Sequence, residues 1–267
     1  MSRSKQSAEF LAGRSIHEEW ESDYLNADLD AFYDAAFAKL IMRLGAKPGD
    51  KILDAGCGYC FHATRLARAG LLVTAVDLSP AALEEARRIL EGQKLSIDLR
   101  QGDLLSLPFH DESFQFVNCW GVLMHIREVE KALEELARVL ECGGRLAIME
   151  NNRRSFHVRI WELAIRTTKR IVGRKVPRRD STPRGVEEWR EEGLLIRKLD
   201  IDWLIDFYAQ RGLNLVDRFA GQFTEAYTNL PTKTLKKFVY RFNERWFRSE
   251  WPPGLALANI LIFEKNA

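Results

Sequence analysis

The apolar residues of this chain fall into short continuous runs that alternate with stretches of helical spacing. The runs of strand length cover residues 51–55, 71–76, 97–100, 113–119, 145–150, 213–219 and 256–264. Helices are predicted over residues 8–24, 28–44, 61–69, 128–140 and 200–211, with a further one beginning at Ser79-Pro80. Strands that alternate with helices predict a doubly wound α/β sheet.

The most informative stretch is residues 51–77, KILDAGCGYCFHATRLARAGLLVTAVD. A buried strand breaks into Gly56-Cys57-Gly58, a helix follows, and a second strand ends in Asp77. Glycines let the backbone turn sharply and approach a ligand closely. Asp77 stands 19 positions after Gly58 (77 − 58), where a carboxylate at a strand end can accept both hydroxyls of a ribose. This pattern predicts the nucleotide-binding half of the sheet.

Two residues of the turn indicate which nucleotide is bound. Phe61 occupies the position where a dinucleotide-binding turn has its third glycine, so a pyrophosphate is disfavoured. Asp54, just before the turn, suits a cationic ligand better than a phosphate.

The stretch LDAGCG resembles motif I of the class I S-adenosylmethionine-dependent methyltransferases, of the type 11 kind. Residues 51–150 follow the family pattern nearly from end to end, although Cys60 stands where the family often has a third glycine. The resemblance implies a Rossmann-like sheet of seven mostly parallel strands, with the last strand antiparallel. It also implies S-adenosyl-L-methionine as the cofactor, and cofactor contacts at Asp54, Gly56, Cys57, Gly58, Asp77, Leu78, Asp103, Leu104 and Trp120.

The family pattern gives several of these positions a role. Asp103 matches the acid that accepts a hydrogen bond from the adenine amino group, with Leu104 beside it. Helices that precede motif I commonly cover the cofactor, and Trp20 and Tyr24 share one face of such a helix. Tyr24 is therefore a further candidate cofactor contact. The alternative is that both aromatic residues only pack the helix against the sheet.

His125, in GVLMHI after the fourth strand, is the candidate catalytic residue. Methyl transfer from a sulfonium is an in-line displacement in which the protein mainly aligns the reacting atoms. A base assists only an acceptor that loses a proton near the transition state, and a histidine suits that task near neutral pH. The alternative is a structural histidine, as in many members of the family, and this is the interpretation that we expect. Glu150, Asn151 and Asn152 either orient a polar acceptor or cap the exit of the fifth strand.

The resemblance divides the chain into segments. Residues 1–50 form helices over the cofactor site, and residues 51–150, 200–219 and 256–267 form the methyltransferase core. Residues 151–199 and 220–255 are insertions that should meet over the active site as one substrate cap, because ligands of such sheets bind beyond the carboxyl ends of the strands. Plausible substrate contacts within this cap are Arg184, Glu187, Trp189, Arg197, Gln222, Thr224, Glu225 and Tyr227.

The first insertion contains a basic segment, residues 153–184, with eleven basic and two acidic residues, and its first part is predicted to be an amphipathic helix. Phe156, Ile160, Leu163, Ala164 and Ile171 share its apolar face. Such a helix can lie on an anionic membrane surface. The alternative that we favour is a helix whose apolar face packs on the protein. The basic face could also attract an anionic acceptor.

The composition of the chain bears on its expected location, disulfides and metal binding. The 267 residues carry a net charge of +2, lack the apolar stretch of a signal peptide and contain no apolar run long enough to span a membrane. Four cysteines do not make a disulfide scaffold, and the Cys57-x-x-Cys60 pair has no second pair to complete a zinc site, so no metal is expected. The expected location is the cytoplasm, with peripheral membrane contact through residues 153–184.

The preferred function is methyl transfer to a small-molecule, saccharide or lipid-linked acceptor. One alternative is a nucleic-acid methyltransferase, which the basic insertion suggests. The fourth strand ends in CWGV rather than an NPPY-like tetrapeptide, and no RNA-binding module is recognised, so nucleic acid is a less expected partner. The other alternative is a non-catalytic S-adenosylmethionine-binding protein. The oligomeric state is left open.

Overall fold

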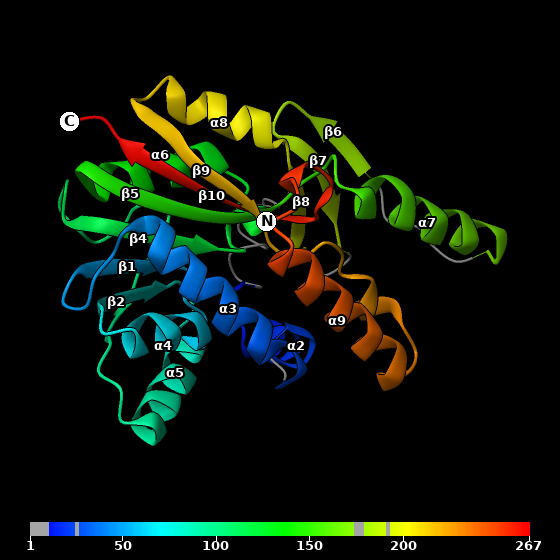
Figure 1. Cartoon of the computed structure of the whole chain (residues 1–267), viewed down its shortest axis with the longest axis horizontal. Helices are drawn as coiled ribbons and strands as arrows, with labels where there is room; N and C mark the ends of the chain where they lie inside the picture. The colour runs from blue at the N-terminus through cyan, green and yellow to red at the C-terminus, as the bar shows by residue number, and fades with distance from the viewer. Residues whose placement is uncertain (1–10, 25–26, 174–178, 191–192) are drawn as a thin grey trace.

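The computed structural model describes residues 11–24, 27–173, 179–190 and 193–267. A seven-stranded sheet forms the centre of the molecule, with helices on both faces (Figure 1). In sheet order the strands are β3 (Asp98–Gln101), β2 (Leu72–Asp77), β1 (Lys51–Ala55), β4 (Phe114–Trp120), β5 (Leu140–Asn151), β10 (Ala258–Lys265) and β9 (Leu213–Ala220). Pairing is parallel from β3 to β5, whereas β10 runs antiparallel to both of its neighbours. This confirms the predicted fold.

Alternate residues of the strands pack against different helices, as expected for a sheet buried on both faces. Leu53 belongs to the core beneath α6 (Val129–Val139) and α8 (Ile201–Ala209). Its neighbour Ile52 belongs to the core on the opposite face. Helices that contribute to that second core are α3 (Ala27–Leu44), α4 (Phe61–Arg68), α5 (Pro80–Gln93) and α9 (Lys233–Arg248).

Element boundaries differ modestly from the predictions. β5 begins at Leu140, five residues earlier than expected, so the predicted turn at Gly143-Gly144 lies within the strand. α2 (Arg14–Tyr24) corresponds to the first predicted helix, and the part of that prediction before residue 11 lies outside the described residues.

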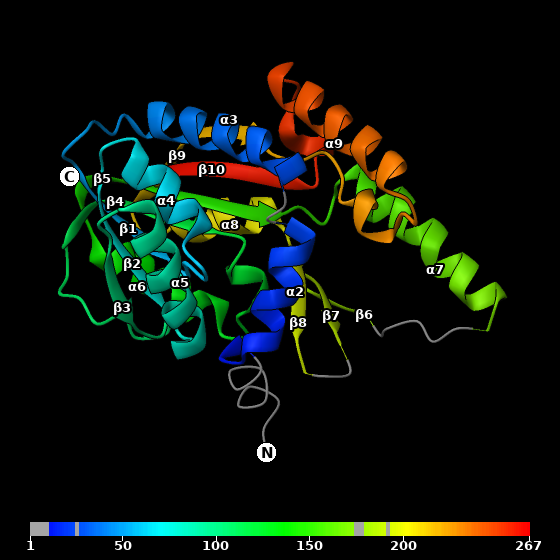
Figure 2. The ribbon, with the colours of Figure 1, turned by 90° about the horizontal axis from the view of Figure 1, so that it is seen from below.

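The first insertion contains the predicted amphipathic helix and, after it, three strands that the sequence did not predict. A short π-helix, η2 (His157–Trp161), leads into α7 (Glu162–Ile171), and an antiparallel sheet follows, formed by β6 (Arg179–Thr182), β7 (Gly185–Trp189) and β8 (Leu195–Leu199). The second insertion consists of η3 (Ala226–Asn229), α9 and η4 (Pro253–Leu255). Both insertions lie at one end of the molecule, where α7 and α9 extend away from the central sheet (Figure 2).

Candidate functional site

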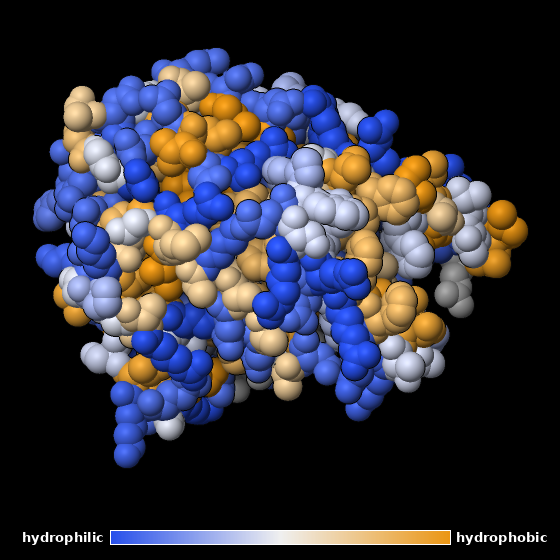
Figure 3. All heavy atoms as spheres, in the orientation of Figure 1, coloured by the Kyte–Doolittle hydropathy of each residue, from blue (hydrophilic) through white to orange (hydrophobic). Residues whose placement is uncertain are grey.

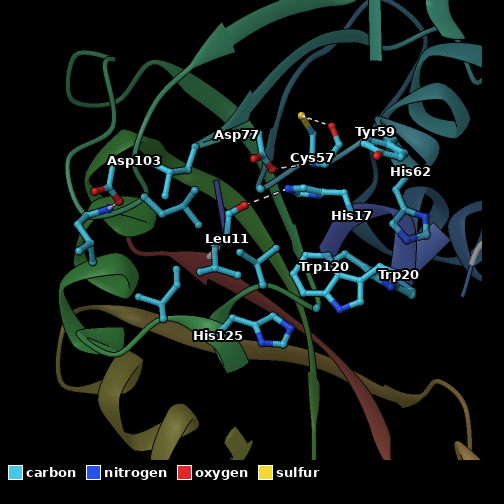
Figure 4. Close-up of a pocket in the computed structure, with 18 of the residues that line it drawn as sticks. Leu11, His17, Trp20, Cys57, Tyr59, His62, Asp77, Asp103, Trp120 and His125 are labelled. Carbon is cyan, nitrogen blue, oxygen red and sulfur yellow. Dashed lines mark hydrogen bonds between the residues drawn. The ribbon is translucent and has the colours of Figure 1, made fainter. Parts of the chain in front are cut away.

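A cavity of about 490 Å³ lies at the carboxyl ends of β1, β2 and β4. Segments that follow parallel strands meet at this edge, and each contributes to the lining (Figure 4). The lining includes all of the predicted cofactor contacts except Asp54 and Tyr24, namely Gly56, Cys57, Gly58, Asp77, Leu78, Asp103, Leu104 and Trp120. The candidate catalytic residue, His125, also lines it. Their roles remain predictions.

The glycine turn is held in a conformation that excludes a side chain. Gly56 has a φ of 80°, and a Cβ at this position would lie 2.6 Å from Val122 Cγ2. The amide of Gly58 donates a hydrogen bond of 2.8 Å to Oδ2 of Asp77, and the amide of Ser79 donates one of 2.8 Å to Oδ1. The Asp77 carboxylate is thereby fixed at the cavity edge, and each oxygen retains a lone pair for a ligand hydroxyl.

The other motif I acid, Asp54, lies beneath the turn rather than in the lining. It is 2% exposed and accepts a 2.6 Å hydrogen bond from the Asn118 side-chain amide. Burial raises the pKa of Asp54 to about 6, partly offset by this hydrogen bond. Among the described residues, its Oδ2 has no hydrogen-bond partner. Asp54 therefore adds negative charge below the first cavity, although its side chain does not line that cavity.

The residue that departs from the family pattern, Cys60, shows why a glycine is common there. Cys60 has a φ of 63°, in the left-handed region that favours glycine, and its side chain is fully buried. Cys57 is a free thiol, as is Cys60, and their mutual hydrogen bond and burial raise the pKa of Cys57. Within the described part of the chain, no cluster of His, Cys, Asp and Glu is arranged to hold a metal ion.

The charge of this cavity suits a cation. Three carboxylates, Asp77, Asp103 and Glu128, line it against one arginine, Arg127. Asp103 accepts a 2.9 Å hydrogen bond from the Leu105 amide, which orients its carboxylate. A phosphate would be repelled here, whereas an amino group or a sulfonium would be attracted.

The N-terminal segment closes one side of the cavity. His17 donates a hydrogen bond from Nε2 to the Leu11 carbonyl at 3.1 Å and stacks on Tyr59 at a centroid distance of 5.6 Å. Trp20 stacks on His125 at 4.9 Å. His17 and Tyr59 were not predicted from the sequence, because the stacking of their rings joins segments 42 residues apart (59 − 17). Tyr24 is the last residue of α2, and its side chain lies outside what the structure describes.

His125 lies in η1 (Leu123–His125), where its Nδ1 donates a 2.8 Å hydrogen bond to the Leu195 carbonyl. Burial lowers the pKa of His125 to about 4, so the ring is neutral at pH 7. The hydrogen bond leaves Nε2 as the acceptor of the neutral imidazole. His125 therefore holds a hydrogen bond to the backbone of β8 and also lines the first cavity.

Arg197 on β8 holds the η1 segment in place. It is fully buried, and its guanidinium donates to Oε1 of Glu187 at 3.0 Å and to the carbonyls of Leu123, Ile126 and Arg127 at 3.2, 2.7 and 3.2 Å. The interpretation of Arg197 and Glu187 as substrate contacts is wrong, because these side chains are used within the protein. Sequence alone could not pair β8 with a loop about 70 residues earlier.

A second cavity of about 570 Å³ adjoins the first. The two share Trp20, His62, Trp120, Gly121 and His125 as lining residues. Residues of both insertions complete it, from His157, Glu162, Arg166 and Lys169 to Gln222 and Glu225. Of the remaining predicted substrate contacts, Arg184, Trp189, Thr224 and Tyr227 do not line it.

Three consecutive polar residues, Glu150, Asn151 and Asn152, lie at the end of β5 and directly after it. Asn151 lines the second cavity, whereas Asn152 donates to the Gly254 carbonyl and accepts from the Arg154 amide, so it caps the chain exit. Glu150 is fully buried, and burial raises the pKa of its carboxyl to about 8. It is therefore uncharged at pH 7.

The second cavity is lined by both apolar rings and charged groups. Its basic lining residues are Arg166, Lys169, Arg179, Arg190 and Lys198, against the acids Glu162, Glu188 and Glu225. Arg166 approaches Glu188 at 3.5 Å, and Lys198 approaches Glu162 at 3.1 Å. Lys169 has no carboxylate partner among the described residues. The cavity therefore carries an excess of positive charge.

These ion pairs turn the polar face of α7 inward, so the favoured prediction for this helix is wrong. Ile160 and Leu163 are 53% and 59% exposed, and Ile171 is 79% exposed. The apolar face that was expected to pack on the protein points to solvent. The reason is that Glu162 and Arg166 form ion pairs with residues of β6, β7 and β8. The positions of these three strands could not be predicted from the sequence.

Comparison with known proteins agrees with the geometry. Residues 53–148 match the sequence profile of a family described as "Methyltransferase domain". Demethylmenaquinone methyltransferase from Renibacterium salmoninarum is 36% identical over 113 residues, which are 42% of this chain and 46% of that protein. The uncharacterized methyltransferase YodH from Bacillus subtilis is 38% identical over 116 residues, 43% of this chain and 49% of that protein. The aligned region spans about half the length of these curated relatives.

Solved structures share the fold over most of the chain. The PH0226 protein from Pyrococcus horikoshii covers 95% of this chain and all of its own, with a TM-score of 0.64 and 13% identity. The cyclase SpnF covers 88% of this chain and 81% of its own, with a TM-score of 0.58 and 19% identity. Because one of these neighbours is named as a cyclase, the fold alone does not fix the reaction.

Proposed function

We propose that the chain transfers a methyl group from S-adenosyl-L-methionine to a small-molecule acceptor, because residues 53–148 match a methyltransferase domain and form the fold of a Rossmann-like sheet. The observation that carries this proposal is the pair of adjoining cavities with opposite charge. The first is lined by carboxylates and the second by an excess of basic residues, and they meet at Trp20, Trp120 and His125.

The residues of the first cavity fit the cofactor. The fixed Asp77 carboxylate suits ribose hydroxyls, and Asp103 with Leu104 suits an adenine ring. The glycine turn offers backbone groups where a Cβ at Gly56 would not fit. When bound, S-adenosylmethionine supplies an electrophilic methyl group on a positively charged sulfur. Aromatic faces such as those of Trp20 and Trp120 stabilise a nearby cation by about 1 kcal/mol.

The protein residues then have three tasks at the junction. The aromatic walls exclude water and orient the acceptor against the first cavity. The neutral ring of His125, held by the Leu195 carbonyl and stacked on Trp20, keeps one wall of the junction in place. Lys169 can hold an anionic or electron-rich oxygen, since it has no described carboxylate partner.

The acceptor class that best fits is an aromatic or quinol-like molecule with an ionisable oxygen. Trp20, Phe32, Tyr33 and Met149 give the second cavity an apolar side, and the basic residues give it a positive side. The similarity to demethylmenaquinone methyltransferases supports a quinone as one candidate. A saccharide or a lipid-linked metabolite remains within the proposal.

The test is transfer of a deuterated methyl group. The protein is incubated with S-adenosylmethionine labelled in the methyl group and with a reduced, demethylated naphthoquinone or a fractionated extract, and products are analysed by mass spectrometry. We expect label in a small molecule, and loss of that label with Asp77→Asn. Label in nucleic acid would support the nucleic-acid alternative instead. Cofactor binding with no transfer to any fraction would support the non-catalytic alternative.

A further inference from the structure

The outer surfaces of the two insertions form a continuous apolar area. On the α7 side, Phe156, Ile160, Leu163 and Ile171 are exposed. Phe156 stacks on Phe223 at a centroid distance of 5.7 Å, and Phe223 contacts Phe242 of α9 at 5.4 Å. The two helices therefore share one surface rather than presenting separate apolar spots.

The helix α9 repeats the arrangement seen in α7. Leu235, Phe238 and Phe242 are spaced three and four residues apart and form an exposed stripe, in which Phe238 is 74% exposed. Tyr240 and Phe247 on the opposite face are buried in the core. We define the docking surface as the apolar stripes of both helices, which are Phe156, Ile160, Leu163, Ile171 and Val172, together with Leu235, Phe238 and Phe242.

Apolar side chains gather visibly at this end of the molecule, over and beside α7 at the right of the view (Figure 3). An exposed contiguous patch of this kind marks a site of association, because leaving large apolar side chains in water is unfavourable. Within the part of the chain that the structure describes, no helix is both long and apolar enough to cross a bilayer.

The charges around the docking surface indicate its partner. Arg159 and Arg170 on the η2–α7 segment are exposed, as are Arg241 and Arg245 on α9. None of these four forms an ion pair with another described residue. The acid on the same part of α9, Glu244, is already engaged with Arg248 at 2.8 Å. Apolar stripes flanked by unpaired arginines are complementary to a surface with anionic headgroups above hydrocarbon.

We propose that the docking surface binds the interface of an anionic lipid membrane, with the apolar stripes of α7 and α9 among the acyl chains and the arginines on the phosphates. The inward-facing side of α7 lines the second cavity, through Ile165, Arg166 and Lys169. Docking therefore brings this cavity next to the bilayer. As a consequence that rests on the proposed function, the acceptor is an amphiphile presented by the membrane.

Vesicle co-sedimentation tests the proposal without cofactor or acceptor. The full chain is mixed with vesicles of phosphatidylcholine alone, or of phosphatidylcholine with phosphatidylglycerol. We expect binding to the anionic vesicles that weakens with added salt and is much weaker on the neutral vesicles. Because no methyl transfer is needed, failure here leaves the proposed reaction standing, and failure of the reaction leaves docking standing.

Matched variants identify the surface. The pair Leu163→Asn with Phe238→Asn should reduce binding by roughly tenfold or more, since it removes two apolar anchors. The control pair Met42→Asn with Leu72→Asn changes residues that are also exposed, at 65% and 58%, but outside the docking surface, and it should leave binding unchanged. Arg159→Glu with Arg170→Glu should abolish the preference for anionic vesicles, whereas Arg87→Glu with Lys94→Glu on and beside α5 should not.

Each contrary result is decisive, provided that the variants keep the melting temperature of the parent chain. Absence of binding at low salt would overturn the proposal, and so would equal loss in the control pair. Light scattering measures whether a second copy of the chain, rather than a membrane, occupies the docking surface. If the chain is a dimer that the Leu163→Asn with Phe238→Asn pair converts to a monomer, the surface belongs to a second copy and not to a membrane.

Discussion

The amide of Gly58 donates a 2.8 Å hydrogen bond to Oδ2 of Asp77, so the turn after β1 and the end of β2 are joined across the mouth of the first cavity. The 19-residue separation seen in the sequence is thus a direct contact in the structure. It sets both the shape of the glycine turn and the direction of the carboxylate. Substitutions on either side of this contact should therefore affect cofactor binding through geometry as well as through chemistry.

Gly56→Ala should weaken S-adenosylmethionine binding by more than about tenfold, because the new methyl group clashes with Val122 and forces the turn to move. The matched control is Gly143→Ala. Gly143 has a similar φ of 73°, but a Cβ there meets no atom within 4 Å. The control should lose about 1–2 kcal/mol of stability from backbone strain alone and keep its cofactor affinity. Urea denaturation and calorimetric titration measure the two effects, and equal affinities for both variants would refute the assignment of the turn.

The two roles considered for His125 can be separated by two substitutions. His125→Asn can retain a donor to the Leu195 carbonyl while removing Nε2, whereas His125→Ala removes both groups. We expect a structural role, in which Ala lowers the melting temperature by an amount that corresponds to about 1 kcal/mol or more, and Asn largely restores stability and turnover.

The pH profile gives an independent check on His125. Because burial lowers the pKa of His125 to about 4, the ring stays neutral from pH 5 upward, and turnover should not titrate near 6.5 through this residue. If His125→Asn folds normally but loses most of its turnover at pH 7, and regains it as the pH rises and the acceptor ionises, His125 is a general base instead.

Glu150 should make stability depend on pH. Its folded pKa of about 8 lies above the ordinary value of 4.5, so between these values the unfolded chain loses a proton that the folded chain keeps. Stability from this group is therefore largest below about pH 4.5 and falls as the pH rises toward 8. Each pKa unit corresponds to about 1.4 kcal/mol, so the loss amounts to several kcal/mol.

Glu150→Gln, which cannot ionise, should remove this dependence. The difference in the free energy of unfolding between Glu150→Gln and the parent chain should grow in favour of the variant from pH 5 to pH 8, as measured by urea denaturation. A difference that stays constant over this range would show that Glu150 is already ionised in the folded protein. The same measurement on an exposed acid of α5, Glu91→Gln, provides the baseline.

Arg197→Lys should destabilise the protein by about 2–4 kcal/mol, because a lysine cannot reach Glu187 and the carbonyls of η1 and the two residues after it together. It should also weaken cofactor binding, since Arg127 and His125 of the same segment line the first cavity. Arg184→Lys is the matched control, as Arg184 is partly exposed and pairs with Glu130 at 3.1 Å. If both variants lost stability and cofactor affinity to the same extent, the proposed role of the Arg197 guanidinium would be contradicted.

The sequence predicts the central sheet well because its signals are local. Gly56 and Gly58 mark the end of β1, and Asp77 marks the end of β2. The pairing of these strands follows from the alternation of strands and helices along the chain. Asp103 and Trp120 were placed at the same edge by the family pattern, and the structure brings both to the first cavity.

The insertions were predicted poorly because their structure depends on contacts between distant segments. The amphipathic pattern of residues 156–171 correctly indicates a helix, but the pattern cannot say which face is turned inward. That orientation is set by the ion pairs of Glu162 and Arg166 with residues of the β6–β7–β8 sheet. The buried Arg197 illustrates the same limit, since its partners lie on β7 and in the η1 segment.

Calorimetric titration measures whether the first cavity binds S-adenosyl-L-methionine through Asp77. We expect saturable binding of S-adenosylmethionine, no measurable binding of NAD, and affinity reduced at least about tenfold by Asp77→Asn, since a hydrogen bond to a charged group contributes about 1.5–3 kcal/mol. Asp98→Asn changes an exposed acid at the start of β3, the strand next to β2, and should leave the affinity unchanged. Micromolar binding of NAD, or an Asp77→Asn variant that binds S-adenosylmethionine as tightly as the parent chain, would contradict this assignment of the cavity.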